Sequence, residues 1–549
     1  MTNKDLADLI FPDVNKTIED YEKMYPEREL KEGTKVTRFA PSPTGFMHIG
    51  NLMSALTDYI LAKNSNGIYM LRNEDTDGKR EIEGALDTIV GILKHYDLMP
   101  DEYEYHEETK GNYGPYVQSE RKEIYRAFAK HLVEIGRAYP CFCTKEETDK
   151  VVEMQKSSGQ RTGYYGRFAK CRNLSIDEAY KRIENGEPYV LKFKSSGNFD
   201  KKFPFDDLVK GRIELPENDQ DVPILKSSNG LPTYHFAHVV DDHLMRTTHV
   251  VRGEEWLPSV PLHMDLFRAF GFKIPKYIHN PLILKKEGNI VRKISKRKDP
   301  EALMNYYEEK GYPKESIIEA LLTIINSNYE EWRTSHPEAP FTEFEFSPKK
   351  MSKSGAFFDL EKLNNISKNI ISRMTKDELY DELLNWAKKY DEKFALILEK
   401  DTDYTKAILN IEREQKKPRK DYAYYSEIKD KIWYMFDELY DSHEKEYEYQ
   451  LIKDEKEINE IISSYLNDYY EESDDKDTWF NKIKDLSEKF GYAREVKDYK
   501  ENPEKYKGHV GDVSTALRVS ITTSSMTPDL FEIMKLLGKE RMLKRIKTK

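Results

Sequence analysis

The 549-residue sequence predicts a Rossmann-like α/β nucleotide-binding fold that is split by an insertion and followed by an all-helical C-terminal region. Three observations lead to this prediction. Strand and helix patterns alternate near the N-terminus, the same α/β pattern returns after a stretch of different character, and helical periodicity dominates after residue 366. A chain of this length exceeds what one hydrophobic core supports, so we expect several domains.

Charge and cysteine content limit the classes of protein to consider. The net charge is −11, from 88 basic and 99 acidic residues, which taken alone argues against a nucleic-acid partner. Binding follows local patches, however, so net charge decides little in a multidomain chain. Three cysteines cannot form a disulfide framework, no apolar run is long enough to span a bilayer, and the N-terminus does not resemble a signal peptide. We therefore expect a cytosolic, monomeric protein with no membrane partner.

The first half of the α/β fold follows a helical preface at residues 1–33. Residues 34–40 and 67–73 read as strands, and residues 52–64 and 81–95 carry apolar side chains at helical spacing. The order strand, helix, strand, helix predicts parallel strands joined by crossover helices.

The character of the chain changes after residue 113. A helix at 119–136 leads into a cysteine-containing strand, a polar helix and short runs at 189–194 and 205–212. This segment reads as an inserted domain. The α/β pattern resumes at residue 232, with a helix at 262–270 and a strand at 278–284, so the nucleotide-binding fold is predicted to consist of two separated halves.

Helical patterns dominate the rest of the chain. Residues 317–326 form an apolar helix, and amphipathic helices follow from residue 366 onward. The charge-rich segment 440–480 keeps an apolar spacing, so we expect helix there and not disorder. The predicted domains are the preface 1–33, the first α/β half 34–113, the insertion 114–229, the second α/β half 230–298, a helical domain 299–369 and an all-helical domain 370–549.

A His-Ile-Gly-Asn turn between the first strand and the first helix predicts a phosphate site. His48 precedes the helix, whose N-terminal amides face any anion bound at this junction. The imidazole can donate to a phosphate oxygen, and Gly50 lets a nucleotide approach the backbone. The same four residues also suit a helix start that packs closely against a neighbour, so the turn alone does not decide.

The residues around this turn carry a family resemblance. RFAPSPTGFMHIGNLMSAL at 38–56 resembles the first signature of the class I aminoacyl-tRNA synthetases, and its first eight residues resemble the lead of bacterial glutamyl-tRNA synthetases. Further segments similar to that family are LRNEDTD at 71–77, QSER at 118–121, VVDDH at 239–243, RGEEW at 252–256 and PDLFEIMKLLGKER at 528–541. The resemblance implies that the insertion meets the acceptor end of tRNA, that residues 299–369 contact its stem and that residues 370–549 bind its anticodon.

The second signature of the class is a flexible lysine loop, and the chain offers two candidates. KISKR at 293–297 is inexact, whereas KMSKS at 350–354 matches letter for letter. The loop has to close over phosphates held by the first turn, so it should leave the same sheet. Residues 293–297 follow the last α/β strand by a short hairpin-like link, so we assign the role to them. The perfect copy is expected to be a basic linker that caps the next helix.

The resemblance implies roles for residues of both α/β halves. The residues expected to act in catalysis are His48, Lys293, Ser295 and Lys296. The residues expected to bind ATP, which arrives with Mg²⁺, are Thr44, Gly45, His48, Gly50, Asn51, Glu255, Trp256 and Lys296.

The amino-acid pocket has to hold a side-chain carboxylate beside an α-ammonium and an α-carboxylate. Guanidinium forks suit carboxylates, and the resemblance gives Arg252 the γ-carboxylate of glutamate. The full expected set is Arg38, Ala40, Ser42, Glu74, Tyr234, His238 and Arg252. His238 stands where bacterial members often carry Asn, and its charge would titrate near neutrality. A surface salt bridge is the alternative role for Arg38 or Glu74.

Three cysteines in the insertion raise the question of a metal. Cys141, Cys143 and Cys171 lie where some relatives carry a zinc knuckle with a tyrosine four residues before the last cysteine. Here Arg167 occupies that place and Tyr165 lies six residues before Cys171. Structural zinc prefers four ligands, so buried free cysteines are favoured over bound zinc.

One basic segment of the helical region suits tRNA. Its basic residues are Lys416, Lys417, Arg419 and Lys420, and Tyr422, Tyr424 and Tyr425 follow closely. Aromatic rings beside positive charge are what stacking on unpaired bases requires. A solvated helix start explains the segment equally well.

The resemblance implies a two-step reaction. L-Glutamate is activated by ATP to glutamyl-adenylate, and the glutamyl group is then transferred to the 3′-terminal adenosine of tRNA(Glu). The alternatives are an enzyme that also charges tRNA(Gln), a glutaminyl-tRNA synthetase, or a non-catalytic RNA-binding relative. The last is opposed by the intact set of His48, Glu74, Arg252 and Lys296.

Overall fold

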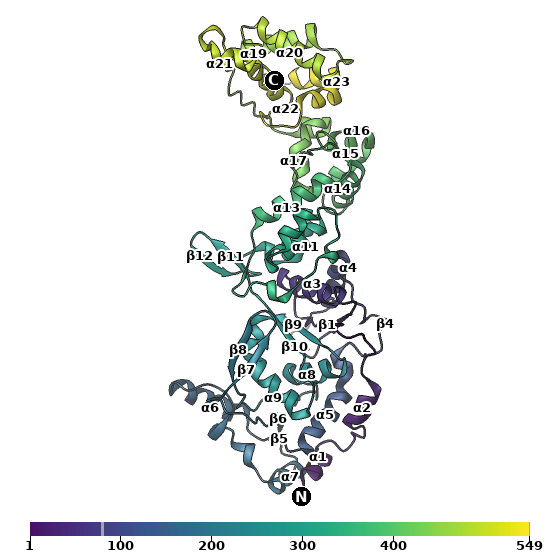
Figure 1. Cartoon of the computed structure of the whole chain (residues 1–549), viewed down its shortest axis with the longest axis vertical. Helices are drawn as coiled ribbons and strands as arrows, with labels where there is room; N and C mark the ends of the chain where they lie inside the picture. Colours follow the sequence, from purple (N-terminus) through teal and green to yellow (C-terminus); the bar gives the residue numbers. More distant parts are fainter. Residues whose placement is uncertain (78–81, 548–549) are drawn as a thin grey trace. The chain divides into compact units, whose positions relative to one another are not determined.

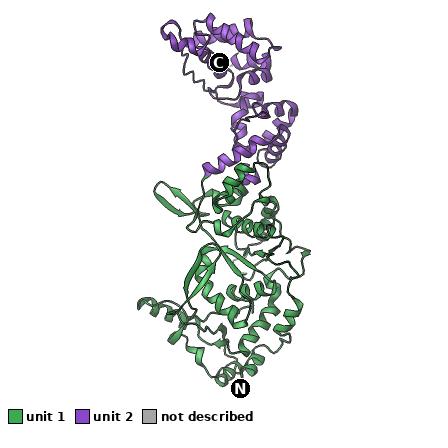
Figure 2. Ribbon diagram, in the orientation of Figure 1, with its two compact units in different colours: residues 1–306, 318–359 green, residues 307–317, 360–549 purple. Residues whose placement is uncertain are grey.

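The computed structural model describes residues 1–77 and 82–547 of the chain (Figure 1). These residues form two compact units, which Figure 2 colours separately: residues 1–306 with 318–359, and residues 307–317 with 360–549. The first unit holds every strand that the structure describes. None of its described helices is long and apolar enough to cross a membrane, and the same holds for the second unit.

The first α/β half has the predicted parallel arrangement. Strands β1 (Val36–Phe39) and β2 (Ile68–Leu71) pair in parallel, and helix α3 (Ile49–Lys63) connects them. The helix begins three residues earlier than predicted because His48 caps it. The His48 Nδ1 accepts the amide of Asn51 at 3.2 Å, and the Asn51 side chain accepts the amide of His48 at 3.1 Å.

Helix α4 (Ala85–His95) closes this first half. It begins after Gly84, which has a left-handed φ of 75°. The predicted helix started at Glu81, which lies outside the described residues.

The second α/β half contributes to a four-stranded sheet in the order β8-β7-β10-β9. Strands β9 (His249–Gly253) and β10 (Lys276–Asn280) are parallel. Thr248 also hydrogen-bonds Val36 of β1, so β9 lies beside the first half. Helices α8 (Tyr234–Leu244) and α9 (Val260–Phe270) pack against each other and supply the helical layer.

Two local predictions differ from the structure. The run at 205–212 is the turn region of a hairpin, β7 (Lys202–Asp207) and β8 (Gly211–Pro216), that joins the main sheet through one parallel pair, Tyr277 with Asp207. The predicted strand at 278–284 is interrupted at Pro281, so β10 ends and β11 (Ile283–Glu287) begins a new hairpin with β12 (Ile290–Lys293).

The remaining elements of the first unit surround this sheet. The preface forms α1 (Asn3–Ile10) and α2 (Ile18–Met24), which pack on α5 (Lys122–Glu134). The other elements are β3 (Tyr103–Tyr105), β4 (Glu108–Lys110), β5 (Ala138–Cys141), α6 (Lys145–Ser157), α7 (Ile176–Glu184), β6 (Val190–Phe193), α12 (Tyr329–Ser335) and β13 (Ala356–Phe357). One apolar core runs from the preface through α5 to α8 and α9.

The regular secondary structure of the second unit is helical throughout its described residues, which confirms the predicted all-helical C-terminal region. Its charge-rich part, predicted as helix over 440–480, forms α19 (Glu455–Ser464), whereas residues 443–454 form no helix. The other helices of the chain's later part are α10 (Met304–Lys310), α11 (Lys314–Ile325), α13 (Leu360–Arg373), α14 (Lys376–Tyr390), α15 (Glu392–Lys400), α16 (Thr402–Leu409), α17 (Ile428–Ile432), α18 (Asp437–Ser442), α20 (Lys476–Lys489), α21 (Val496–Glu501), α22 (Val510–Thr522) and α23 (Leu530–Lys547).

Candidate active site

A cavity of about 620 Å³ opens at the carboxyl ends of the parallel strands β1, β2, β9 and β10. Ligands of open α/β sheets bind at this edge. The predicted site residues that line the cavity are Arg38, Ala40, Ser42, Thr44, His48, Gly50, Asn51, Glu74, Tyr234, Arg252, Glu255, Trp256, Lys293 and Lys296. The fold therefore gathers residues from both halves of the chain around one space.

His48 presents one nitrogen to this cavity. Because Nδ1 accepts the Asn51 amide, the neutral ring carries its proton on Nε2. Burial, together with repulsion from Lys296 and Lys293, lowers the pKa of His48 to about 4. A side chain at position 50 would begin 3.0 Å from the imidazole, so glycine there keeps the ring in place. The ring is thus a neutral donor at a helix N-terminus, which suits a phosphate oxygen.

The inexact lysine segment lies at the edge of the same cavity. The predicted hairpin-like link is the hairpin of β11 and β12, and the segment begins where β12 ends. The Lys296 Nζ donates to the carbonyl of Phe46 at 2.5 Å. The Phe46 residue belongs to the first signature, so this contact joins the two signatures. Gly45 is not among the described lining residues, but a Cβ there would lie 3.9 Å from the Lys296 Nζ.

Ser295 occupies the base of this segment and not the described cavity wall. Its amide donates to the Asp299 carboxylate at 2.8 Å. Asp299 also accepts from Arg292, and these bonds lower the pKa of Asp299. The carboxylate therefore holds the turn that carries Lys296.

The letter-perfect lysine segment lies elsewhere in the first unit. Lys350 and Lys353 are exposed and are not among the described residues that line the cavity. The segment leads into β13, which pairs in parallel with β11. The carbonyl of Lys353 accepts from the Lys210 Nζ at 2.6 Å. This segment is therefore fixed through its backbone.

A buried charge network forms one wall at the amino-acid end. Arg38 donates to Asp242 at 3.0 Å, and Arg72 donates to the same oxygen at 2.8 Å. Arg72 also donates to Glu74 at 3.0 Å. Burial alone would lower the pKa of Arg38, but the charge of Asp242 raises it. Arg38 and Glu74 are buried, so the alternative role as a surface salt bridge does not apply.

Arg252 lines the cavity at the carboxyl end of β9. Its Nε donates to His279 at 3.0 Å and its Nη1 donates to His263 at 3.0 Å. The rings of Tyr234 and Trp256 pack beside it with centroids 4.3 Å apart. Two arginines and an aromatic pair thus line the same cavity as His48 and Lys296.

His238 is placed differently from expectation. It lies one helical turn behind Tyr234 on α8, is fully buried and is not among the described lining residues. Its Nε2 bonds the Tyr277 hydroxyl at 2.9 Å and its Nδ1 lies 2.6 Å from Asp242. The expectation that it titrates near neutrality is wrong, because burial lowers the pKa of His238 to about 3 although Asp242 opposes this.

Sequence reasoning missed several lining residues. The polar ones are Ser54, Thr76, Asp77, Gln118, Lys226, Thr233 and Asn280. The Lys226 Nζ donates to the carbonyl of Thr76 at 2.6 Å and so braces the segment after β2. Gln118 and Asp77 lie in segments that carry the family resemblance, and that was a usable signal. No sequence pattern singles out Lys226, because only the fold brings it there.

The basic segment of the helical unit is partly used for structure. Arg419 binds Glu412 at 3.1 Å and Asp421 at 3.0 Å, whereas Lys416, Lys417 and Lys420 are exposed. The expectation that the following tyrosines stack on bases is wrong for Tyr422 and Tyr425, since both are buried in the core of this unit.

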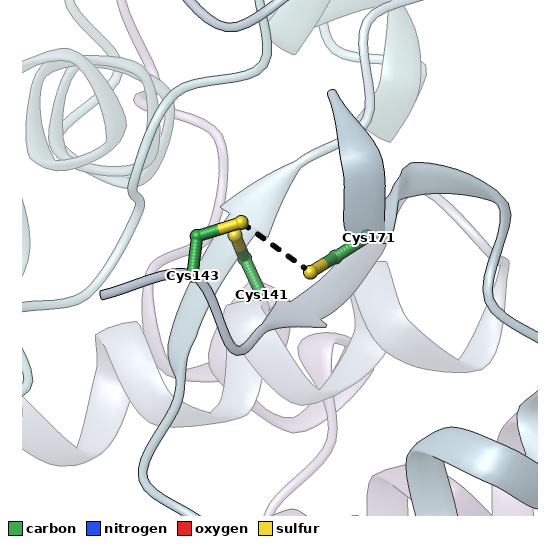
Figure 3. A group of neighbouring side chains, drawn as sticks. All are labelled: Cys141, Cys143 and Cys171. Carbon is green, nitrogen blue, oxygen red and sulfur yellow. Dashed lines mark hydrogen bonds between the residues drawn. The ribbon is translucent and has the colours of Figure 1, made fainter. Parts of the chain in front are cut away.

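The three cysteines of the insertion form one cluster (Figure 3). The sulfurs lie within 4.8 Å of one another, and those of Cys143 and Cys171 are 3.7 Å apart. The Tyr164 hydroxyl lies 3.2 Å from Cys141 and 3.3 Å from Cys143. The sequence analysis considered Tyr165 and Arg167 and overlooked Tyr164. Tyr164 lies seven residues before Cys171 and not four, and a loop with several glycines brings it back to the cysteines.

Two family profiles match nearly the whole chain. Residues 35–365 match "tRNA synthetases class I (E and Q), catalytic domain", and residues 378–549 match "Anticodon binding domain". These matches cover both units described above and confirm the predicted order of an α/β catalytic fold followed by a helical region.

Full-length relatives share the same order. The chain is 48% identical over 547 residues to the glutamate–tRNA ligase of Acetivibrio thermocellus, covering 100% of this chain and 99% of that one. It is 49% identical over 549 residues to that of Clostridium perfringens strain 13, covering all of both. A crystal structure of a glutamate tRNA ligase from Elizabethkingia meningosepticum in complex with its amino acid aligns with a TM-score of 0.74 at 26% identity, over 94% of this chain and 99% of that one. The chain therefore belongs to the glutamate–tRNA ligase family of class I aminoacyl-tRNA synthetases.

Proposed function

We propose that this chain attaches L-glutamate to tRNA(Glu) at the expense of ATP. One observation carries the proposal: a single cavity is lined both by a neutral donor with a lysine, His48 and Lys296, and by two arginines, Arg38 and Arg252. The first pair suits phosphates and the second suits the carboxylates of glutamate. Names of the relatives, all glutamate–tRNA ligases, support the same substrates.

The first step joins glutamate to AMP. An oxygen of the glutamate α-carboxylate attacks the α-phosphorus of ATP, and the bond from this phosphorus to the pyrophosphate oxygen breaks. The enzyme contributes mainly by holding both reactants in line and by stabilising charge. His48 donates through Nε2, and Lys296 adds a positive charge near the leaving pyrophosphate. Mg²⁺, when bound with ATP, neutralises phosphate oxygens.

The second step transfers the glutamyl group. A ribose hydroxyl of the terminal adenosine of tRNA, the 2′-OH by family resemblance, attacks the carbonyl carbon of the mixed anhydride. AMP leaves with the bridging oxygen. In this scheme Arg252 and Arg38 keep the glutamate side chain and backbone in place through both steps, with Tyr234, Ser42 and Glu74 beside them.

ATP–pyrophosphate exchange tests the proposal directly. We expect exchange with L-glutamate in the presence of tRNA(Glu), and little exchange with L-glutamine. Exchange with glutamine alone, or none with either amino acid, would contradict the assignment. Charging of tRNA(Glu) and tRNA(Gln) in parallel then measures whether the enzyme also accepts the second tRNA.

The parts that meet tRNA are proposed from the family resemblance. The insertion is proposed to meet the acceptor end, and the helical residues 378–549 to bind the anticodon, with Lys416, Lys417 and Lys420 exposed for the tRNA backbone. The chain is proposed to act as a monomer, because residues of one chain suffice to line the cavity. It is also proposed to be cytosolic.

A structural zinc ion is proposed at the cysteine cluster, contrary to the expectation from sequence. Zinc about 2.3 Å from each sulfur would separate tetrahedral sulfurs by about 3.8 Å, close to the 3.7 Å between Cys143 and Cys171. Cys141 and the Tyr164 hydroxyl would complete four ligands. Metal analysis of the purified protein tests this: we expect about one zinc per chain, lost in Cys171→Ala and weakened in Tyr164→Phe but not in Tyr165→Phe.

A further inference from the structure

Arg252 is held differently from the other buried arginines at the amino-acid end. Arg38 and Arg72 share the carboxylate of Asp242. Arg252 has no carboxylate partner among the described residues. Its guanidinium instead bonds two imidazoles at 3.0 Å each and the Trp256 carbonyl at 3.4 Å, and it lies 4.8 Å from the centre of the Tyr277 ring.

The hydrogen bonds determine the tautomers of both imidazoles. A guanidinium only donates, so the nitrogens that face it must accept. His279 therefore carries its proton on Nδ1, which donates to the Asp207 carboxylate at 2.6 Å. His263 carries its proton on Nε2, which donates to Nδ1 of His235 at 2.9 Å. Both rings are consequently neutral.

Asp207 anchors this chain of bonds in the sheet. One carboxylate oxygen accepts the amides of Val209 at 2.9 Å and Lys210 at 2.7 Å. The other accepts the amide of His279 at 3.2 Å besides the ring proton. The carboxylate therefore links β7 to β10 and has no freedom to turn. Asp207, His279 and His263 are all buried.

We propose that Asp207, His279 and His263 form a positioning relay that orients Arg252 toward the side-chain carboxylate of the amino-acid substrate. The inference rests on the proposed function. Its physical reason is that neutral acceptors hold a cation without cancelling its charge. A carboxylate in their place would compete with the substrate. Three N–H groups donate to His279, His263 and the Trp256 carbonyl, and the Tyr234 hydroxyl also interacts with the guanidinium. Each terminal nitrogen has a second N–H that can donate to one oxygen of a carboxylate.

Asp207→Asn reverses the direction of the relay. The amide oxygen keeps the two short bonds to Val209 and Lys210, so the amide nitrogen faces His279. The ring must then accept on Nδ1 and carry its proton on Nε2, where it meets the N–H of Arg252. We expect the KM for L-glutamate to rise at least about 10-fold, because an N–H that meets the N–H of Arg252 turns the guanidinium away from the substrate, while the KM for ATP stays within about two-fold.

Matched variants separate positioning from folding. Asp206→Asn is the control, because Asp206 is exposed and its ion-pair partner among the described residues is Arg212, which lies opposite it on β8. At position 279, Gln places an acceptor where Nε2 stood, whereas Asn reaches only the place of Nδ1. We expect His279→Gln to retain more glutamate affinity than His279→Asn. Equal losses in both, or an unchanged KM in Asp207→Asn, would overturn the relay.

A spectroscopic measurement tests the relay independently of the reaction. In full-length protein labelled with ¹⁵N-histidine, the His279 Nε2 should show the shift of an unprotonated nitrogen in the wild type and of a protonated one in Asp207→Asn. A protonated Nε2 in the wild type would overturn the relay, even in an enzyme that charges tRNA with glutamate. Correct tautomers in a protein that does not activate glutamate would instead overturn the proposed function, and with it the purpose given to Arg252.

Discussion

The two lysine segments of the first unit differ in whether their side chains or their backbone make the contacts with the rest of the protein. Residues 293–297 carry the inexact motif, and the side chains of Lys293 and Lys296 line the cavity. Residues 350–354 carry the perfect motif, and their exposed lysines are not among the described lining residues. Exposure does not separate the two, since Lys296 is exposed as well. Lys296 makes its contact through its side-chain amine, whereas Lys353 makes its contact through its backbone carbonyl.

The backbone contacts of the perfect copy explain its role. Met351 forms a bridge with Asn326, the Lys353 carbonyl accepts from Lys210, and the amide of Ala356 donates to Leu282 at 2.9 Å. The segment thereby adds a short strand to β11, the first strand of the hairpin that leads to Lys296. The comparison teaches that a motif identifies a function only together with the sheet edge from which it leaves.

The largest expected difference between the two segments is the effect of replacing Lys296. We expect Lys296→Ala to lower the rate of glutamate-dependent ATP–pyrophosphate exchange about 100- to 1000-fold, because a positioned cation near developing charge is lost. Single-turnover kinetics would show whether chemistry or ATP binding is affected. A comparable loss in Lys353→Ala, with Lys296→Ala nearly active, would reverse the assignment of the two segments.

A second variant tests the supporting role of the perfect copy. Gly355 has a φ of +124°, and a Cβ there would lie 2.4 Å from the Leu284 side chain of the hairpin. We expect Gly355→Ala to destabilise the protein by about 1–3 kcal/mol and to raise the KM for ATP several-fold.

Gly288 offers the matched control for this variant. It sits in the turn of the same hairpin with a φ of +58°, but a Cβ there meets nothing within 4 Å. Gly288→Ala should cost only the backbone strain of about 1–2 kcal/mol and leave the KM for ATP unchanged. Equal effects on the KM in both variants would show that strand addition by the perfect copy does not support the hairpin.

Local patterns predicted the first strands and helix of the α/β fold, but not how distant strands meet. The period-2 and helical patterns of β1, α3 and β2 suffice for a parallel unit, and the hairpin before Lys296 follows from a short link. The joining of β7 to β10 rests on one residue pair, Tyr277 with Asp207, far apart in sequence. No local pattern reports such a pair.

The same limit applies to the candidate site. Residues inside the family signatures, such as Arg38 and Lys296, were found from sequence. His263 and His279 were not found from sequence, because no local pattern identifies a buried histidine that accepts a hydrogen bond from an arginine. Tyr164 was missed because loop glycines with positive φ, among them Gly163, bring it back to the cysteines.

The pKa of His48 tests which of the two lysines, Lys296 or Lys353, lies close to the imidazole. The pKa of His48 is about 4 in the folded protein, below its usual 6.5, so the unfolded state binds more protons between these values. His48 therefore costs stability as the pH falls from about 6.5 to about 4. Because Lys296 repels the imidazolium and Lys353 is not among the causes of the shift, Lys296→Ala should raise the pKa of His48 and Lys353→Ala should not. NMR titration of the His48 ring measures this, and equal pKa values in all three proteins would contradict it.

The smallest expected effect belongs to Lys353 itself. Its side chain is exposed, and the atom that the structure uses is its carbonyl oxygen, which alanine also provides. Lys353→Ala should therefore change kcat/KM for ATP by less than about two-fold and the free energy of unfolding by less than about 0.5 kcal/mol. Lys210→Met removes the amine that holds this carbonyl and Glu254, so it should lower stability more than Lys353→Ala does. If Lys353→Ala proved the more damaging of the two, the perfect segment would act through its side chain, and its likeness to the signature would reflect function after all.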